Sequence, residues 1–417
     1  MQLDPTSGSS ANDFPRSNGK KDKDVVIASP STTDHVRGSD TPSLIPKNEI
    51  ASMKQSDTKG ANDLELWYKQ TIANMRKYGA ANIDADDIED IQDFFSLNYS
   101  SFLGSLALAA QEKIGPPPTE FAIVGLGSLG RYEAGPYSDL DFAFLVADDS
   151  DDSRQYFLEM ATEMNRLVAS LDESEEGIIF CDGGLTPPFF MGKSNFPFGS
   201  QALVDTPDSM SKWTISDETP ETFDKRKNMA NPGTIRNSMT FSQYMYGDEK
   251  LFYQLRSANQ KQMQKIPHGS ALERYKKWRG GLTYGKLNGL ELIEPKIIVE
   301  ASSAELNLKK STLSPIMTIV RGLCFYYDID ETNISAGIDE LQKRGHLSPE
   351  LAIRMKNVYQ AAFKKRMELQ MKKHDSSFEC EELSPKEEQE NAALVQELQK
   401  RATRFIRSNG KSNPFAK

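Results

Sequence analysis

Residues 121–146, FAIVGLGSLGRYEAGPYSDLDFAFLV, constrain the fold of this chain more than any other stretch. An apolar run from Phe121 to Leu126 meets a Gly-Ser turn, and a second apolar run follows an Asp-x-Asp pair. Because side chains alternate along a strand, Asp139 and Asp141 face the same side of the chain. Two carboxylates placed in this way can share a divalent cation, so the stretch predicts a metal-binding pair.

The turn between the apolar runs has the composition of a phosphate-binding loop. Gly127 lets the backbone come close to a phosphate, and the hydroxyl of Ser128 can hydrogen-bond to it. Arg131 adds a fixed positive charge, and Glu133 stands where it can hold Arg131 in a charge-assisted pair. A lone Asp-x-Asp pair more often caps a turn than binds a metal, but here several elements agree in order and spacing.

The composition argues against several classes of protein. With 417 residues and 38% hydrophobic content, the chain can bury the cores of two or three domains. Its three cysteines are widely spaced, which predicts neither a disulfide framework nor a zinc site and favours the cytoplasm. The net charge of -10 argues against nucleic acid as the main partner. No run of about 18 apolar residues occurs, so we expect no membrane span.

The pattern of Gly-Ser, ten residues and Asp-x-Asp resembles the signature of the DNA polymerase β type nucleotidyltransferases. Its longer form, GSLGRYEAGPYSDLD, is similar to the motif of the protein-PII uridylyltransferases and the signal-transduction nucleotidyltransferases related to them. The resemblance extends over about residues 60–375. It implies a nucleoside triphosphate as substrate, with Mg²⁺ (or Mn²⁺) held by the carboxylates and the phosphates held by the serine turn.

The resemblance implies an α+β fold, in which an N-terminal helical region and a C-terminal helical bundle flank a small mixed nucleotidyltransferase sheet. A polar start that cannot bury a core indicates a disordered tail ahead of these parts. The expected divisions are a disordered tail (1–60), an N-terminal helical region (61–115), the nucleotidyltransferase domain (116–260), a C-terminal helical domain (261–375), and an acidic linker with a terminal helix and polar tail (376–417).

The same resemblance assigns roles to individual residues. From it we expect Asp139 and Asp141 to be catalytic and to bind the metal, and Gly127, Ser128, Arg131, Glu133 and Ser138 to bind the nucleotide. Asp182 is the third expected catalytic residue, but it is assigned from its own sequence context and not from the resemblance.

This chain departs from the family at one point. In this branch a third carboxylate lies in an Asp-Leu-Arg-like segment before a Gly-Asp pair. Gly247 and Asp248 match that pair, but Phe241 and Gln243 stand where Asp and Arg are expected.

Two other acids are candidates to replace the missing carboxylate. Asp182 lies two residues after a predicted buried strand, Ile178–Phe180, and we rank it first. Asp205 is the second candidate.

The predicted function is transfer of a nucleoside monophosphate from a nucleoside triphosphate to a hydroxyl, on a partner protein, with release of pyrophosphate. The missing acid supports an alternative, a catalytically degenerate nucleotide-binding regulator or interaction protein with the same fold. The sequence identifies neither the base, nor the acceptor, nor the oligomeric state.

Three other charged features have competing interpretations. Arg321 and Arg366, in predicted C-terminal helices, can either reach the nucleotide or form structural salt bridges, and we favour the second. The acidic run 148–152 fits a helix entrance better than a calcium loop. The Glu-rich stretch 378–391 is interpreted as a solvated linker, and an acidic export signal there is the weaker alternative.

Overall fold

The computed structural model describes residues 61–84, 87–138, 140–169, 204–212, 242–264, 306–373, 379–380, 384–408 and 410–417. The predicted tail (1–60), the predicted strand 178–180, and the residues Asp139, Asp182 and Phe241 lie outside these ranges. Among the described helices, none combines the length and apolar character that crossing a bilayer requires.

A mixed four-stranded sheet forms in the order β3-β2-β1-β4. Strand β1 (Phe121–Gly125) pairs antiparallel with β2 (Phe142–Val146) and with β4 (Gln243–Gly247). The short strand β3 (Val204–Asp205) runs parallel to β2. The two strands predicted around the Gly-Ser turn are therefore the central pair of the sheet.

Both central strands are buried on both faces, which explains their uninterrupted apolar sequence. Alternate side chains divide between two cores. Ile123 and Phe144 belong to the larger core, whereas Val124 and Leu145 belong to a smaller one on the other face.

Helices α2 (Ala61–Asn82), α3 (Ile88–Ile114) and α4 (Asp151–Ala169) contribute to the larger core. Helix α3 begins at Ile88 because the Asp87 side chain accepts a hydrogen bond from the Glu89 amide at 3.0 Å and caps the helix. Helix α4 begins at Asp151, so part of the acidic run forms its first turn. The run therefore lies at the start of a helix, as we predicted from the sequence.

On the opposite face, α6 (Pro207–Lys212) and α9 (Glu249–Gln264) pack against each other and against the central strands. Leu251 and Leu255 of α9 bury their side chains beside Val124 in the smaller core. The described helices thus enclose the sheet between two layers, which leaves the ends of its strands as places for a site.

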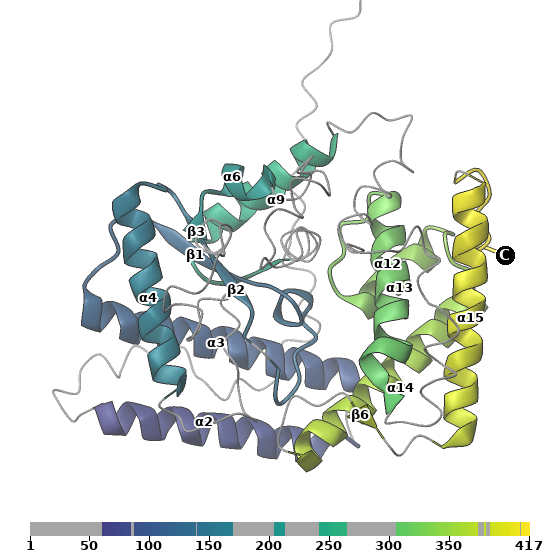
Figure 1. The fold of residues 1–417 in the computed structure, drawn as a ribbon, viewed down its shortest axis with the longest axis horizontal. Coiled ribbons are helices and arrows are strands. Elements are labelled where there is room, and N and C mark those ends of the chain that lie inside the picture. Colours follow the sequence, from purple (N-terminus) through teal and green to yellow (C-terminus); the bar gives the residue numbers. More distant parts are fainter. Residues whose placement is uncertain are drawn as a thin grey trace, which may run out of the picture. The chain divides into compact units, whose positions relative to one another are not determined.

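The C-terminal helices are α12 (Ser314–Tyr326), α13 (Ile334–Lys343), α14 (Pro349–Lys373) and α15 (Pro385–Arg407), green to yellow in Figure 1. A π-helical turn (Lys309–Leu313) precedes α12, and two short strands, β5 (Leu306–Asn307) and β6 (Glu379–Cys380), pair antiparallel. Apolar side chains of the four helices join the larger core. The predicted α+β class is confirmed.

The end of the chain is more ordered than its composition predicts. Helix α15 begins within the predicted linker, because Ser384 and Glu387 form a capping box in which each side chain accepts a hydrogen bond from the other's backbone amide. The expected polar tail carries Phe415, which is completely buried and packs against Phe405. Its carbonyl accepts a hydrogen bond of 2.8 Å from the Ser348 amide, at the start of α14.

Gly247 is the position in the sheet where a side chain is least tolerable. Its φ of 96° lies in the left-handed region, and a Cβ there would overlap the backbone of β1 at Phe121 and Ala122. Gly345, after α13, has a φ of 74° but open space around the position of a Cβ.

We therefore expect Gly247→Ala to lower the free energy of unfolding by about 3 kcal/mol or more, the sum of left-handed strain and overlap. The matched variant Gly345→Ala should lower the free energy of unfolding only by the cost of the left-handed backbone, about 1–2 kcal/mol. Urea denaturation of both variants measures the difference. Equal losses would mean that β1 does not pack against Gly247 in this way.

Candidate functional site

The turn after β1 brings a carboxylate against a glycine. The Leu126 amide donates a hydrogen bond of 2.8 Å to the Asp141 carbonyl, one step beyond the pairing of Gly125 with Phe142. Gly127 has a φ of 56°, and a Cβ at this residue would overlap Oδ2 of Asp141. The turn therefore requires glycine for two reasons, its left-handed backbone and the close approach of the Asp141 carboxylate.

Backbone hydrogen bonds close the turn tightly. Residues Leu129–Arg131 form a single 3-10 turn, and the Glu133 amide donates to the Ser128 carbonyl at 2.9 Å. Tyr132 adopts a left-handed conformation with φ of 53°, which reverses the chain. The Ser128 side chain makes no capping hydrogen bond and is partly exposed, so its hydroxyl is available to a ligand.

The expected pair between Arg131 and Glu133 is present. Nε of Arg131 lies 2.7 Å from Oε2 of Glu133, and Nη1 donates to the Gly127 carbonyl at 2.5 Å. The Glu133 side chain is completely buried. Burial opposes the charge of Arg131, but the neighbouring Glu133 carboxylate more than offsets it and raises the pKa of the guanidinium.

Two residues of the C-terminal helices border this pair. Burial and then the charge of Arg131 hold the pKa of Arg321 well below its usual value. Burial, with Glu133 adding to it, raises the pKa of the Tyr359 hydroxyl well above its usual value. Arg321 and Arg366 are both buried, and their assignment to structural salt bridges stays a prediction.

Ser138 lies just before the Asp-x-Asp pair and is also buried. Its Oγ accepts a hydrogen bond of 2.7 Å from the Gly135 amide. From the N-terminal helices, the hydroxyl of Tyr99 and the Nε of Arg76 donate to the Pro136 carbonyl at 2.8 and 3.2 Å. The loop that leads into Asp141 is thus fixed by α2 and α3.

Asp205 is not the replacement for the missing acid. It pairs with Leu145 on the neighbouring strand, four residues along β2 from Asp141, which corresponds to about 13 Å at the rise of a strand. Its carboxylate accepts from the Thr206 amide at 2.9 Å and faces Arg154 at 3.4 Å. The interpretation of Asp205 as a metal ligand is wrong, because the direction of β3 carries it to the far end of the sheet.

Gln243 lies at the site. It pairs with Gly125 at the turn end of β1, so β4 does bring the altered segment to the expected edge of the sheet. Its side-chain amide donates a hydrogen bond of 2.6 Å to Oγ1 of Thr332. At the position where the related family has arginine, this chain thus has an uncharged side chain that hydrogen-bonds to the segment before α13.

Among the described residues, Asp141 offers a carboxylate to a divalent cation at this turn. The described residues contain no cluster of three or more acidic, histidine or cysteine side chains suited to a metal, and Asp139 and Asp182 lie outside the described ranges. Asp141 itself fits, because it presents a partly exposed carboxylate beside a glycine turn, and carboxylate oxygens are the ligands that Mg²⁺ prefers.

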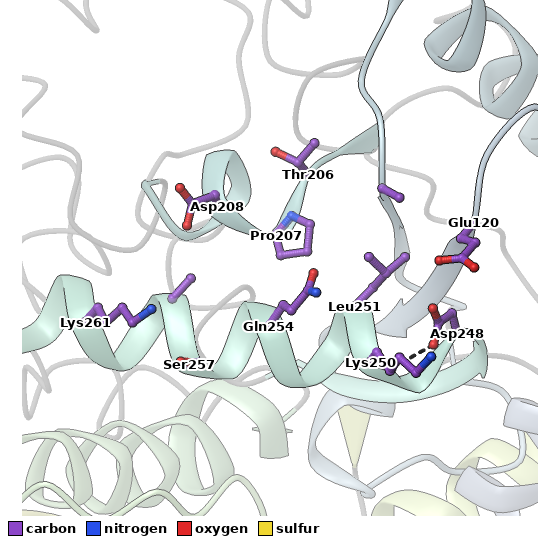
Figure 2. Close-up of a pocket in the computed structure, with 12 residues that line it drawn as sticks. Glu120, Thr206, Pro207, Asp208, Asp248, Lys250, Leu251, Gln254, Ser257 and Lys261 are labelled. Carbon is purple, nitrogen blue, oxygen red and sulfur yellow. Dashed lines mark hydrogen bonds between the residues drawn. The ribbon is translucent and has the colours of Figure 1, made fainter. Parts of the chain in front are cut away.

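A pocket of about 490 Å³ lies at the other end of the sheet, between α6 and α9 (Figure 2). Glu120, which precedes β1, and Asp248, which follows β4, contribute to its rim, together with Asp208, Lys250 and Lys261. These strand ends are remote from Gly127. The pocket is thus separate from the turn that carries the sequence motif.

Comparison with known proteins identifies two family matches. Residues 72–187 match the family described as "Putative nucleotidyltransferase DUF294", and residues 295–404 match the "Putative nucleotidyltransferase substrate binding domain". The first match contains the turn and Asp141. The second contains Arg321, Tyr359 and the segment before α13.

Curated relatives include the bifunctional glutamine synthetase adenylyltransferase/adenylyl-removing enzymes of Bifidobacterium longum. The protein of strain DJO10A is 31% identical over 154 residues, and that of subspecies infantis is 28% identical over 155 residues. Each match covers 34% of this chain and 14% of the relative. The chain therefore spans about a seventh of the length of these relatives.

Sequence reasoning missed three residues that contact this site, namely Thr332, Asn333 and Ile334. Asn333 is a recognisable helix cap before an apolar pattern. No sequence signal, however, connects it to a turn about two hundred residues earlier.

Removing Glu133 should leave the buried charge of Arg131 uncompensated. We expect Glu133→Ala to lower the free energy of unfolding by about 3–5 kcal/mol, and the double variant Glu133→Leu with Arg131→Met to recover most of that loss. Chemical denaturation at pH 7 tests both. An undiminished stability in Glu133→Ala would contradict the buried pair.

Proposed function

We propose, on the premise that this chain belongs to the DUF294 nucleotidyltransferase family, that it transfers a nucleoside monophosphate from a nucleoside triphosphate to a hydroxyl on a partner protein. The observation that carries the proposal is the position of Asp141 against the Gly127–Ser128 turn. A carboxylate and a phosphate-binding turn in contact are what a metal-bound triphosphate requires.

Each part of the turn has an assigned task. The backbone at Gly127 and the hydroxyl of Ser128 bind the phosphates, since the first requires close approach and the second is partly exposed. Arg131, Glu133 and Ser138 hold the two loops in place through the contacts described above. Their effect on the nucleotide is therefore indirect.

The acids would bind the metal and complete the reaction. Asp139 and Asp141 would hold Mg²⁺ or Mn²⁺, and Asp182 is the carboxylate that we assign as the third acid. When bound, the metal neutralises charge on the triphosphate and polarises the α-phosphate. The acceptor oxygen would form a bond to the α-phosphorus and release its proton to solvent, while the bond from the α-phosphorus to pyrophosphate breaks.

A protein acceptor is supported by the relatives, whose name states that they adenylylate glutamine synthetase. Residues 116–260 would form the transferase domain, 261–375 the helical domain, and 61–115 the N-terminal support. The cysteine usage supports action in the cytoplasm.

A second candidate function is a nucleotide-binding regulator without transferase activity. It is favoured by Gln243, which lies beside the turn without a charge and is engaged with Thr332. In this case the turn would still bind nucleotide, but no group would complete the reaction.

Labelled nucleotide transfer separates the two functions. We expect the protein, incubated with each of the four α-³²P nucleoside triphosphates, Mg²⁺ and a cell lysate, to label a protein band. Asp141→Asn should reduce labelling by about a hundredfold or more, because several kcal/mol of charge stabilisation depend on the metal. Chelation of the metal with EDTA should have the same effect.

Two variants serve as comparisons. Asp182→Asn should lose labelling like Asp141→Asn, whereas Asp205→Asn should keep it, since Asp205 lies at the far end of the sheet. Binding of nucleotide measured by calorimetry, without labelling by any of the four triphosphates, would support the regulator. Absence of both binding and labelling would refute both functions.

A further inference from the structure

Three consecutive residues at the start of α13 contact both sides of the phosphate turn. Oγ1 of Thr332 accepts a hydrogen bond of 2.6 Å from Gln243 of β4. The Asn333 side chain donates to the Arg131 carbonyl at 3.2 Å. The Ile334 amide donates to Oε1 of Glu133 at 2.9 Å. We call residues 332–334 the clasp.

The clasp engages groups that also define the turn. Glu133 uses one carboxylate oxygen for the Ile334 amide and the other for Arg131. Arg131 in turn donates to the Gly127 carbonyl at 2.5 Å. The start of α13 is therefore connected, through Glu133 and Arg131, to the glycine against which Asp141 lies.

Burial makes the loss of any of these contacts costly. Thr332 and Ile334 are buried, and Glu133 is completely buried, so water does not readily replace a lost partner. The Glu133 carboxylate also lies at the N-terminus of α13, where the helix dipole favours a negative charge. Charge, hydrogen bonding and the helix end thus favour one arrangement of the turn.

We infer that the clasp is a positioning element for the nucleotide site, by which the C-terminal domain holds the phosphate turn in its binding conformation. This inference rests on the proposed function for its effect on nucleotides, but not for its effect on the turn. A ligand of the C-terminal domain that moves the start of α13 would loosen all three contacts together. Nucleotide affinity would then depend on the state of that domain.

Ile334 allows the central contact to be removed alone. It is the first residue of α13, where proline is favoured, and Asn333 has φ of -74° and ψ of 138°, as the residue before a proline requires. Ile334→Pro removes the amide donor and places its Cδ where the amide hydrogen pointed at Oε1 of Glu133, so the contact cannot form, whereas Ile334→Ala keeps the donor. The comparison between these two variants therefore tests the contact between the start of α13 and Glu133.

Hydrogen exchange of residues 126–134 gives the first readout. We expect exchange in Ile334→Pro to be about tenfold faster than in Ile334→Ala, because a hydrogen bond to a charged group is lost. Equal exchange in the two variants would overturn the inference. This readout tests the positioning role of the clasp independently of nucleotide binding.

Nucleotide affinity gives the second readout. Calorimetry with ATP, CTP, GTP and UTP, each with Mg²⁺, identifies the tightest nucleotide for the wild-type chain. Its Kd should be about tenfold weaker for Ile334→Pro than for Ile334→Ala. If the wild-type chain binds none of the four, the proposed function fails, and the exchange measurement still tests the clasp.

Asn333→Ser separates positioning from stability. Asn333 caps α13 by accepting from the Ala336 amide at 3.0 Å, and serine caps equally well but does not reproduce the longer donor to Arg131. We expect the unfolding midpoint to stay near that of the wild type while the Kd rises about threefold. A Kd unchanged in Asn333→Ser and lowered stability in Asn333→Ala would mean that Asn333 acts only as a cap.

Discussion

The buried ion pair between Arg131 and Glu133 is the interaction on which the site depends. A completely buried carboxylate is costly unless its oxygens are satisfied, and Glu133 satisfies them with one side chain from its own turn and one amide from α13. The same pair orients Arg131 toward the Gly127 carbonyl. A local charge balance thus couples the conformation of the turn to a helix about two hundred residues away.

The sheet explains why the site lies where it does. Both faces of β1 and β2 are covered, so a ligand can approach the central strands only at their ends. One end carries the glycine turn and Asp141, and the other carries the pocket between α6 and α9 (Figure 2). The strand directions place Gln243 at the first end and Asp205 toward the second.

Local features were predictable from the sequence, because their causes are local. The apolar runs at β1 and β2, the cap at Asp87 and the pair between Arg131 and Glu133 follow from composition and spacing over a few residues. The capping box of Ser384 and Glu387 has the same kind of signal, but the Glu-rich composition of the stretch led to a linker being predicted instead.

Features that depend on strand direction or on distant contacts were not predictable. Asp205 could be excluded only when β3 was seen to run parallel to β2. The contact of Ile334 with Glu133 has no counterpart in sequence spacing, because it depends on how the helices pack. The catalytic interpretation comes from the family resemblance. The contacts of Glu133 with Arg131 and Ile334 show which parts of the chain hold the turn in place.

The most direct test of the account is a crystal structure of the chain with Mn²⁺ and a nonhydrolysable nucleoside triphosphate. We predict an anomalous peak beside Asp141, with the phosphates against Gly127 and Ser128. A nucleotide bound instead in the pocket between α6 and α9, with no metal near Asp141, would contradict the account.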